Sequence, residues 1–180
     1  ETLDTSGELQ PVEGASLAFF VAGQPTVLSR AQSDATGAFS TGAVASGGHP
    51  LNAYLKATMP GYRTTFLYPP FPFTKSATTV PLPMLSDPLF ATVATTLGAI
   101  QDDHHAGALL VAVADCQGTL VPGAVLSVTR GNGHVAVGDI HDLGASFVGA
   151  GGRFLVFDVP DGKVDVSAAY SGMPLPQHDV

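Results

Sequence analysis

The His and Asp residues in the second half of the chain are the side chains best suited to chemistry. One run reads Asp102-Asp103-His104-His105, and a second group comprises His134, Asp139, His141 and Asp142. Imidazole and carboxylate groups are good ligands for Zn²⁺ or Cu²⁺. If the second group is extended, Asp139 and His141 lie on the same face of the chain. The candidate metal ligands are therefore Asp103, His104, His105, Asp139 and His141.

Neither group makes a closed metal site by itself. Adjacent residues rarely point at one metal ion, and a closed site needs further ligands from elsewhere in the fold. The run 102–105 also lies in a segment that we expect to connect two domains. A solvated polar linker is the favoured interpretation of this run, and metal binding stays open as an alternative.

No pattern of an enzyme active site is present. Cys116 is the only cysteine, and the neighbouring Asp115 opposes formation of a thiolate. Residues 131–136 match the Gly-x-Gly-x-x-Ala form of a dinucleotide fingerprint, but that motif must open a helix and the residues here are strand-like. Asn-Gly between β-prone runs predicts a hairpin instead. We expect a protein that is not an enzyme and needs no cofactor.

The most unusual local segment is 68–73, which reads Tyr-Pro-Pro-Phe-Pro-Phe. Proline cannot donate to a β-ladder, so this segment predicts an edge strand or a loop. Its aromatic side chains either cover the end of a β-sandwich or form an exposed patch that docks a protein partner. The candidate partner-binding residues are Tyr68, Pro70, Phe71 and Phe73.

The overall composition disfavours several classes of partner. The net charge is −8 and no run of Lys or Arg exists, which disfavours binding to nucleic acid or to anionic lipid. No apolar stretch reaches the ~20 residues that span a bilayer. The chain begins at Glu1 without Met, which suggests a processed mature protein. A lipid anchor upstream of Glu1 stays open.

Short β-prone runs separated by turn residues predict an all-β fold. Glycine occurs 21 times and proline 14 times, and between them lie the runs 17–21, 109–113, 125–128 and 154–157. Such spacing is typical of a β-sandwich or barrel. The exception is 86–98, where Asp87 or Ser86 can cap a helix, Pro88 fits its first turn and Gly98 fits its end.

An internal repeat organises the chain. The turn Val12-Glu13-Gly14-Ala15 matches Val121-Pro122-Gly123-Ala124, and Gly37-Ala38-Phe39 matches Gly152-Arg153-Phe154. We therefore predict two tandem β-sandwich domains, residues 1–86 and 107–180, joined by a linker over 87–106 that contains a short helix.

These repeated motifs resemble those of the carboxypeptidase regulatory-like domain family, together with Asp34-Ala35-Thr36-Gly37, Pro60-Gly61-Tyr62 and Val159-Pro160-Asp161-Gly162. The resemblance implies a transthyretin-like, Ig-like seven-stranded sandwich in each half. It also implies a secreted or surface-exposed accessory module, and it carries no shared catalytic residues. The second half departs from the pattern by a longer stretch over 139–150.

From these features we expect a non-catalytic structural or interaction module of a secreted or surface-anchored bacterial protein, located outside the cytoplasm. A protein partner is expected, for example in a larger membrane-associated assembly of which the chain is an extrinsic subunit. Two other functions stay open. One is binding of carbohydrate or another small ligand on aromatic side chains, against which the absence of Trp counts. The other is metal binding by the His and Asp groups.

Overall fold

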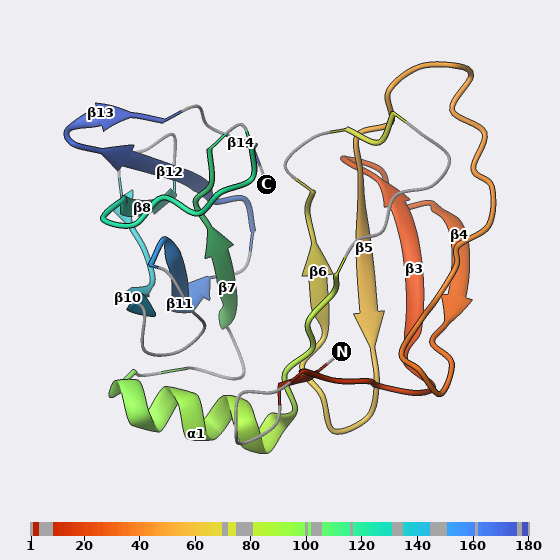
Figure 1. Cartoon of the computed structure of the whole chain (residues 1–180), viewed down its shortest axis with the longest axis horizontal. Helices are drawn as coiled ribbons and strands as arrows, with labels where there is room; N and C mark the ends of the chain where they lie inside the picture. Colours follow the sequence, from red (N-terminus) through yellow and green to blue (C-terminus); the bar gives the residue numbers. More distant parts are fainter. Residues whose placement is uncertain are drawn as a thin grey trace. The chain divides into compact units, whose positions relative to one another are not determined.

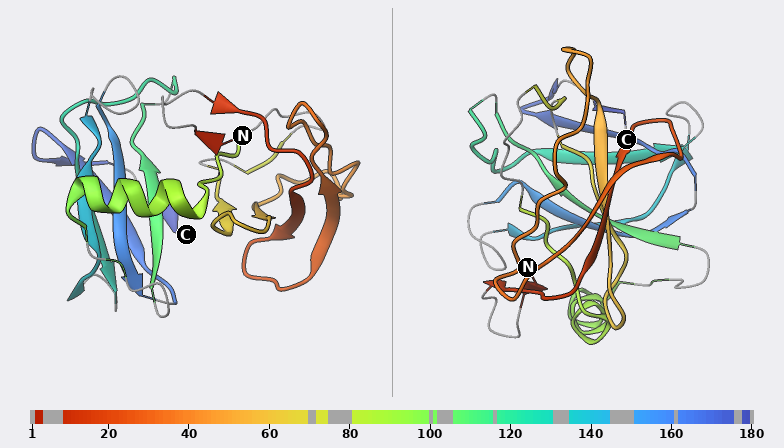
Figure 2. Two further views of the ribbon diagram at one scale, coloured as in Figure 1. Left: turned by 90° about the horizontal axis from the view of Figure 1, so that it is seen from below. Right: turned by 90° about the vertical axis from the view of Figure 1, so that its right-hand side faces the viewer.

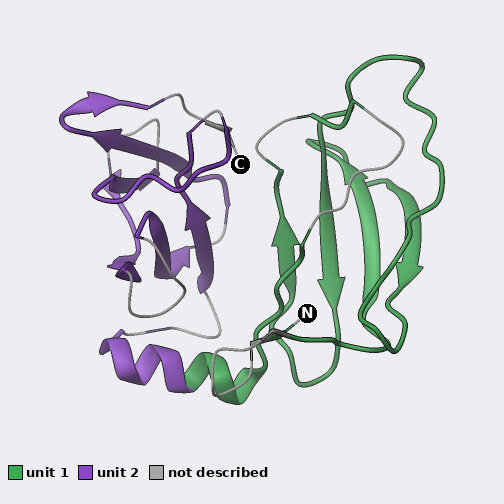
Figure 3. Ribbon diagram, viewed as in Figure 1, with its two compact units in different colours: residues 1–91 green, residues 92–180 purple. Residues whose placement is uncertain are grey.

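Among the residues that the structure describes, short antiparallel strands make up most of the regular structure, and one helix lies between them along the chain. The computed structural model describes residues 2–3, 9–69, 72–74, 81–99, 101, 106–115, 117–130, 135–144, 151–160, 162–175 and 178–179. The chain divides into two compact units, residues 1–91 and 92–180 (Figure 3). The all-β prediction is confirmed at this level.

Unit 1 is built on one four-stranded antiparallel sheet (Figure 1). Its strands are β3 (Ser16–Val21), β4 (Val27–Gln32), β5 (Ala53–Thr58) and β6 (Thr65–Leu67), in the order β4-β3-β5-β6. A separate short pair joins β1 (Thr2–Leu3) to β2 (Leu9–Gln10).

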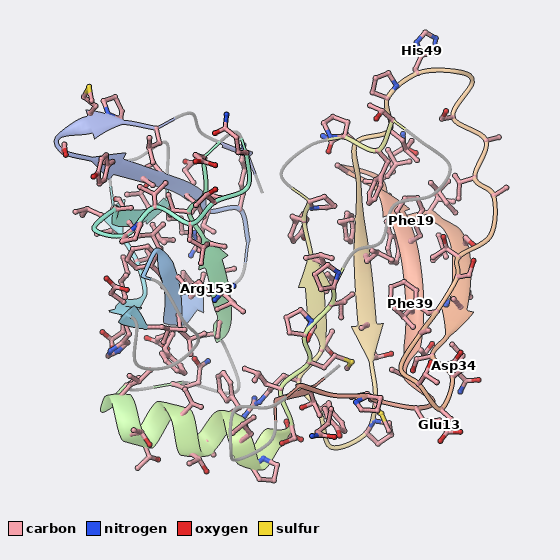
Figure 4. The ribbon with its side chains drawn as sticks, viewed as in Figure 1. Glu13, Phe19, Asp34, Phe39, His49 and Arg153 are labelled. Carbon is pink, nitrogen blue, oxygen red and sulfur yellow. The ribbon has the colours of Figure 1, made fainter. Side chains whose placement is uncertain are left out.

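The core of unit 1 lies against one face of this sheet. Leu17 and Phe19 of β3 and Leu55 and Ala57 of β5 alternate along their strands and are buried. Residues from the irregular segments 39–44 and 81–84 cover them, including Phe39, Val44, Leu82 and Met84 (Figure 4 shows Phe19 and Phe39). One face of the sheet is therefore the inner face, and the alternate side chains form the outer face.

Unit 2 contains two sheets that share one core, and Figure 2 shows their strands from two further directions. The smaller sheet has the order β10 (Asp139–Asp142), β11 (Arg153–Pro160) and β7 (Ala106–Ala112). The larger sheet contains β8 (Val125–Arg130), β9 (Val135–Ala136), β12 (Asp165–Tyr170), β13 (Met173–Pro174) and β14 (His178–Asp179). Leu126 and Val128 of β8 and Phe154 and Val156 of β11 are buried in the common core.

The helix α1 (Asp87–Leu97) begins and ends within the segment where the sequence predicts a helix. The Ser86 hydroxyl accepts a hydrogen bond from the Leu89 N–H at 3.3 Å, so Ser86 is the N-terminal cap. At the other end, the N–H groups of Gly98 and Ala99 donate to the carbonyls of Thr95 and Ala94, and Gly98 has φ 68°. This is a Schellman ending. That the helix links two domains stays a prediction.

The repeated glycines lie in the same packing arrangement in both units. A Cβ on Gly37 would meet the Val12 nitrogen at 3.2 Å, and a Cβ on Gly152 would meet the Val121 carbonyl oxygen at 2.8 Å. In each case the turn that precedes a buried alanine, Ala15 or Ala124, lies directly against the glycine. Only glycine allows this close approach of two backbones.

Replacing Gly152 by Ala should lower the free energy of unfolding by about 3 kcal/mol or more, because the new Cβ overlaps the Val121 backbone and φ is 96°. Gly23→Ala is the matched control, since Gly23 also has positive φ but no atom lies within 4 Å of its Cβ position. It should cost about 1 kcal/mol. Urea unfolding measures both, and equal losses would contradict the packing argument.

Ser33 stabilises the Val12–Ala15 turn from within. Among the described residues it is the polar residue that is buried, with 7% of its surface exposed. Its hydroxyl donates to the Val12 carbonyl at 2.6 Å and accepts from the Ala15 N–H at 2.9 Å. Its own backbone pairs with Gly14 and Ala15. This one hydroxyl is therefore the hydrogen-bond partner of two buried backbone groups of the turn.

Ser33→Ala should destabilise the protein by about 2 kcal/mol, because it leaves a buried N–H and a buried carbonyl without a partner. Ser46→Ala, at an exposed position, is the control and should change stability by less than about 0.5 kcal/mol. Thermal and urea unfolding would both record the difference. A Ser33 variant as stable as the Ser46 variant would show that the turn does not need the hydroxyl.

Candidate functional site

The outer face of the unit 1 sheet carries side chains that are not used in the core. Cross-strand register places Arg30, Ala18, Lys56 and Phe66 in one row across all four strands. The adjacent row contains Phe20 opposite Tyr54. Because side chains alternate along a strand, this face is produced by the same pairing that buries Leu17, Phe19, Leu55 and Ala57 on the inner face.

Three aromatic rings stack on one another across this face, and we call Phe20, Tyr54 and Tyr68 the aromatic column. The ring centroids of Phe20 and Tyr54 are 5.0 Å apart with an interplanar angle of 6°, and those of Tyr54 and Tyr68 are 5.1 Å apart at 27°. Phe66 tilts against Tyr54 with centroids 6.2 Å apart. Such offset stacks contribute about 0.5–1.5 kcal/mol per pair beyond the area they bury.

The outer face nevertheless stays accessible to solvent. Phe66 is 47% exposed and Tyr68 is 46% exposed. Scattered single apolar residues on a surface are ordinary, whereas neighbouring exposed aromatic rings are typical of binding surfaces. The aromatic column and Phe66 are therefore the candidate binding surface of unit 1.

A hollow of about 220 Å³ lies beside the aromatic column. Ala18, the smallest side chain of its row, separates Arg30 from Lys56 and leaves this space open. The hollow is lined by Ser16, Ala18, Phe20, Val27, Arg30, Lys56 and Thr58. It thus combines two cations, two hydroxyl groups and one aromatic ring.

The charge on this face is opposite in sign to that of the whole chain. The four strands of the sheet contain Arg30 and Lys56 and no Asp or Glu, although the chain has a net charge of −8. The Lys56 Nζ lies 5.4 Å from the centroid of the Phe66 ring. Among the described residues, neither cation pairs with a carboxylate. The face therefore offers positive charge to an anionic ligand.

Burial raises the pKa of the Tyr68 phenol above its ordinary value of 10.0, and the phenol of Tyr54 raises it further. The uncharged phenol is therefore favoured in the column, and stability falls as the pH rises from 10.0 toward the folded-state pKa.

The absorbance titration of tyrosinate should show this shift. Subtracting the titration of Tyr68→Phe from that of the unaltered protein should leave a component with a midpoint above 10.0. Tyr170→Phe, outside unit 1, is the control for loss of one phenol. A Tyr68 component at or below 10.0 would show that the phenol is not packed in the column.

The structure separates the residues of the aromatic-proline segment. Tyr68 belongs to the aromatic column, whereas Phe73 packs against the core, with its ring centroid 5.4 Å from that of Phe19. The backbone of Phe73 also pairs with Leu51 through two hydrogen bonds of 2.9 Å. Pro70 and Phe71 lie outside the described residues. The segment thus supplies the outer face with Tyr68 and the core with Phe73.

Of the candidate metal ligands, the structure describes Asp139 and His141 and brings them together. The His141 Nε2 lies 2.9 Å from the Asp139 Oδ2 on β10, and the imidazole ring packs edge-on against Phe157. Asp142 accepts a hydrogen bond from the Gly144 N–H instead. Asp103, His104, His105 and His134 lie outside the described residues, as does Cys116. Within the described ranges no group of three or more His, Cys, Asp or Glu residues could hold a metal ion.

The dinucleotide fingerprint is not supported by the backbone. Strands β8 and β9 pair antiparallel, with Arg130 opposite Val135, on either side of residues 131–134. The end of the motif is therefore a strand, as the hairpin interpretation predicts, and not the start of a helix.

Sequence reasoning missed most of the outer face. Phe20, Arg30, Tyr54, Lys56 and Phe66 come from four strands and were not singled out. The alternation Ala-Tyr-Leu-Lys-Ala-Thr over 53–58 is a signal that could have found β5 and its polar side. No local pattern could have shown that Tyr54 stacks on Phe20, because their pairing joins distant segments.

No protein-family model, no curated protein and no solved structure matches this chain. No helix among the described residues is long and apolar enough to cross a membrane.

Proposed function

We propose that this chain is a non-catalytic binding module that acts outside the cytoplasm of a bacterium, with two tandem β-sandwich domains of the carboxypeptidase regulatory-like type. Its binding surface is the outer face of the unit 1 sheet. In this proposal the module attaches a secreted or surface-anchored protein, or the assembly to which it belongs, to a ligand on that face.

The matching turns of the two units support the tandem arrangement. Gly37 and Gly152 each lie against a Val-x-Gly-Ala turn, and Phe39 and Phe154 follow them into the two cores. In unit 2, one core is shared by two antiparallel sheets, which agrees with a sandwich. In the described part of unit 1, residues of irregular segments pack against the inner face of the sheet.

The single observation that carries the binding role is the aromatic column, which is exposed at Tyr68 and at the neighbouring Phe66, together with the two cations beside it. Exposing stacked rings beside Arg30 and Lys56 does nothing for the core, which lies on the other side of the sheet. Aromatic and Arg side chains dominate the energetics of interfaces. Metal binding is the less favoured alternative, since Asp139 and His141 form a pair that needs further ligands.

Polar replacement of the exposed rings should weaken binding without unfolding the protein. Phe66→Ser combined with Tyr68→Ser removes two side chains that are nearly half exposed. Binding to soluble neutral polysaccharides, acidic polysaccharides and poly-glutamate is measured by affinity electrophoresis and calorimetry. We expect at least one probe to bind, and the double variant to bind it at least about tenfold more weakly.

Val125→Ser combined with Met173→Ser is the matched control, because these residues are exposed to a similar or greater degree in unit 2. This control should bind like the unaltered protein. Circular dichroism and thermal unfolding verify that both variants fold. Absence of binding to every probe, or equal loss in both double variants, would refute the proposed surface.

A further inference from the structure

We infer that the hollow between Arg30 and Lys56 is a subsite for a carboxylate-bearing sugar ring, so that the ligand of the outer face is an acidic polysaccharide. This inference rests on the proposed function and specifies the class of ligand. It follows from the placement of charge, ring face and hydroxyl groups around one small residue.

The two cations are held at a defined separation by the sheet. Arg30, Ala18 and Lys56 are in register on β4, β3 and β5, so their backbones are spaced over two strand separations, or about 10 Å. The small side chain of Ala18 leaves space between these two residues. A guanidinium can donate two parallel hydrogen bonds to a carboxylate, and an ammonium adds a point charge from the opposite side. An anionic group that enters the hollow therefore meets Arg30 on the β4 side, and Lys56, whose ammonium lies 5.4 Å from the centroid of Phe66, adds positive charge from the β5 side.

The ring of Phe20 supplies an apolar wall for the ligand. Tyr54 stacks on one face of this ring at 5.0 Å and Tyr68 covers the other side of Tyr54. Within the column, the ring of Tyr54 thus has both faces occupied. Phe20 is the end of the column nearest β4, where Val27 lies opposite it, and both side chains line the hollow, so the C–H groups of a sugar ring meet an apolar wall there.

The other lining groups match a sugar better than a peptide. Ser16 and Thr58 place hydroxyl groups at the rim of the hollow, where they can exchange hydrogen bonds with ligand hydroxyls. Peptides are commonly bound by addition to a sheet edge or in a groove, whereas this site lies on the face of the sheet, over β4, β3 and β5. The volume of about 220 Å³ is below the about 300–1,000 Å³ of sites that enclose a whole small molecule. One ring fits, and the rest of a polymer extends across the face.

The sign of the charge selects the anionic ligand. The chain has a net charge of −8, so a polyanion is repelled by most of the protein and attracted by this sheet, which carries cations only. Arg63, the other described cation of unit 1, is paired with Asp87 and stacked over Phe90. Binding should therefore weaken as salt is added, since the site is open to solvent.

The test compares polygalacturonate with the same polymer after reduction of its carboxyl groups, using calorimetry and affinity electrophoresis on the full chain. We expect the acidic polymer to bind at least about tenfold more tightly. Arg30→Gln combined with Lys56→Gln should remove that preference. Arg130→Gln combined with Lys163→Gln is the control, because it removes the same total charge from unit 2 and should keep the preference.

A second variant tests the contribution of the hollow to binding separately from that of the two charges. Ala18→Val raises the floor of the hollow with a strand-favouring residue and leaves both cations in place. It should weaken binding of polygalacturonate about as strongly as the charge variant, while thermal unfolding verifies that the sheet is intact. Unchanged binding by Ala18→Val would show that the ligand does not enter the hollow, and would overturn the subsite.

The outcomes distinguish this inference from the proposed function. If the acidic and the reduced polymer bind equally, and Phe66→Ser/Tyr68→Ser loses both, the outer face is still a binding surface. The inference that its ligand is acidic would then be overturned. If poly-glutamate binds as tightly as polygalacturonate, the inference that the ligand is a sugar polymer would be overturned. An acidic polypeptide would then be the ligand class. Loss of binding in the Arg130/Lys163 variant to the same extent as in the Arg30/Lys56 variant would show a general charge effect and overturn the site.

Discussion

The antiparallel pairing of β3 with β5 is the interaction on which both faces of unit 1 depend. In this register Leu17 lies opposite Ala57 and Phe19 opposite Leu55, and all four side chains enter the core. The same register places Ala18 opposite Lys56 and Phe20 opposite Tyr54 on the outer face. A shift of one residue would exchange the two sets, exposing the core and burying a lysine. Burial of the inner face therefore holds the candidate site in place.

One turn in each unit is as closely specified as the strands. Asp34 and Asp115 organise the same kind of turn, in which one carboxylate oxygen accepts the N–H groups two and four residues later. The hydrogen bonds from Thr36 and Ala38 lower the pKa of Asp34, because they favour its charged form. Ser33 and Gly37 then position the Val12–Ala15 turn against the sheet. In this chain, of which only 12% is charged, two of the carboxylates are used to hold backbone turns.

The arrangement of the aromatic column limits what the outer face can bind. Stacking of the rings stabilises the outer face of the sheet. It also covers the ring faces, so a ligand cannot contact them. The two ends of the column and the tilted ring of Phe66 are what remain, and one of those ends lies at the hollow beside Arg30 and Lys56. The geometry thus concentrates recognition where aromatic surface, positive charge and hydroxyl groups meet.

Local order was readable from the sequence because it depends on near neighbours. Ser86, Pro88 and Gly98 indicate a helix, and the runs 125–128 and 154–157 fall within strands β8 and β11. Gly37 and Gly152 stand at matching positions of the repeated motifs, and the structure shows that a Cβ on either would meet the backbone of Val12 or Val121. The all-β class follows from the same short-range signals. In each case the physical cause, a cap, a turn or a conformational preference, acts over a few residues.

Only the tertiary structure decided how these elements combine into a site. Tyr68 and Phe73 are neighbours in one segment, yet one joins the outer face and the other packs against Phe19 in the core. Phe20, Arg30, Tyr54 and Lys56 come together because four strands pair in a particular register, with partners far apart in the chain. That register is set by the burial of apolar side chains on the opposite face. The local sequence shows the alternation of apolar and polar side chains along each strand. It does not show which strand lies beside it.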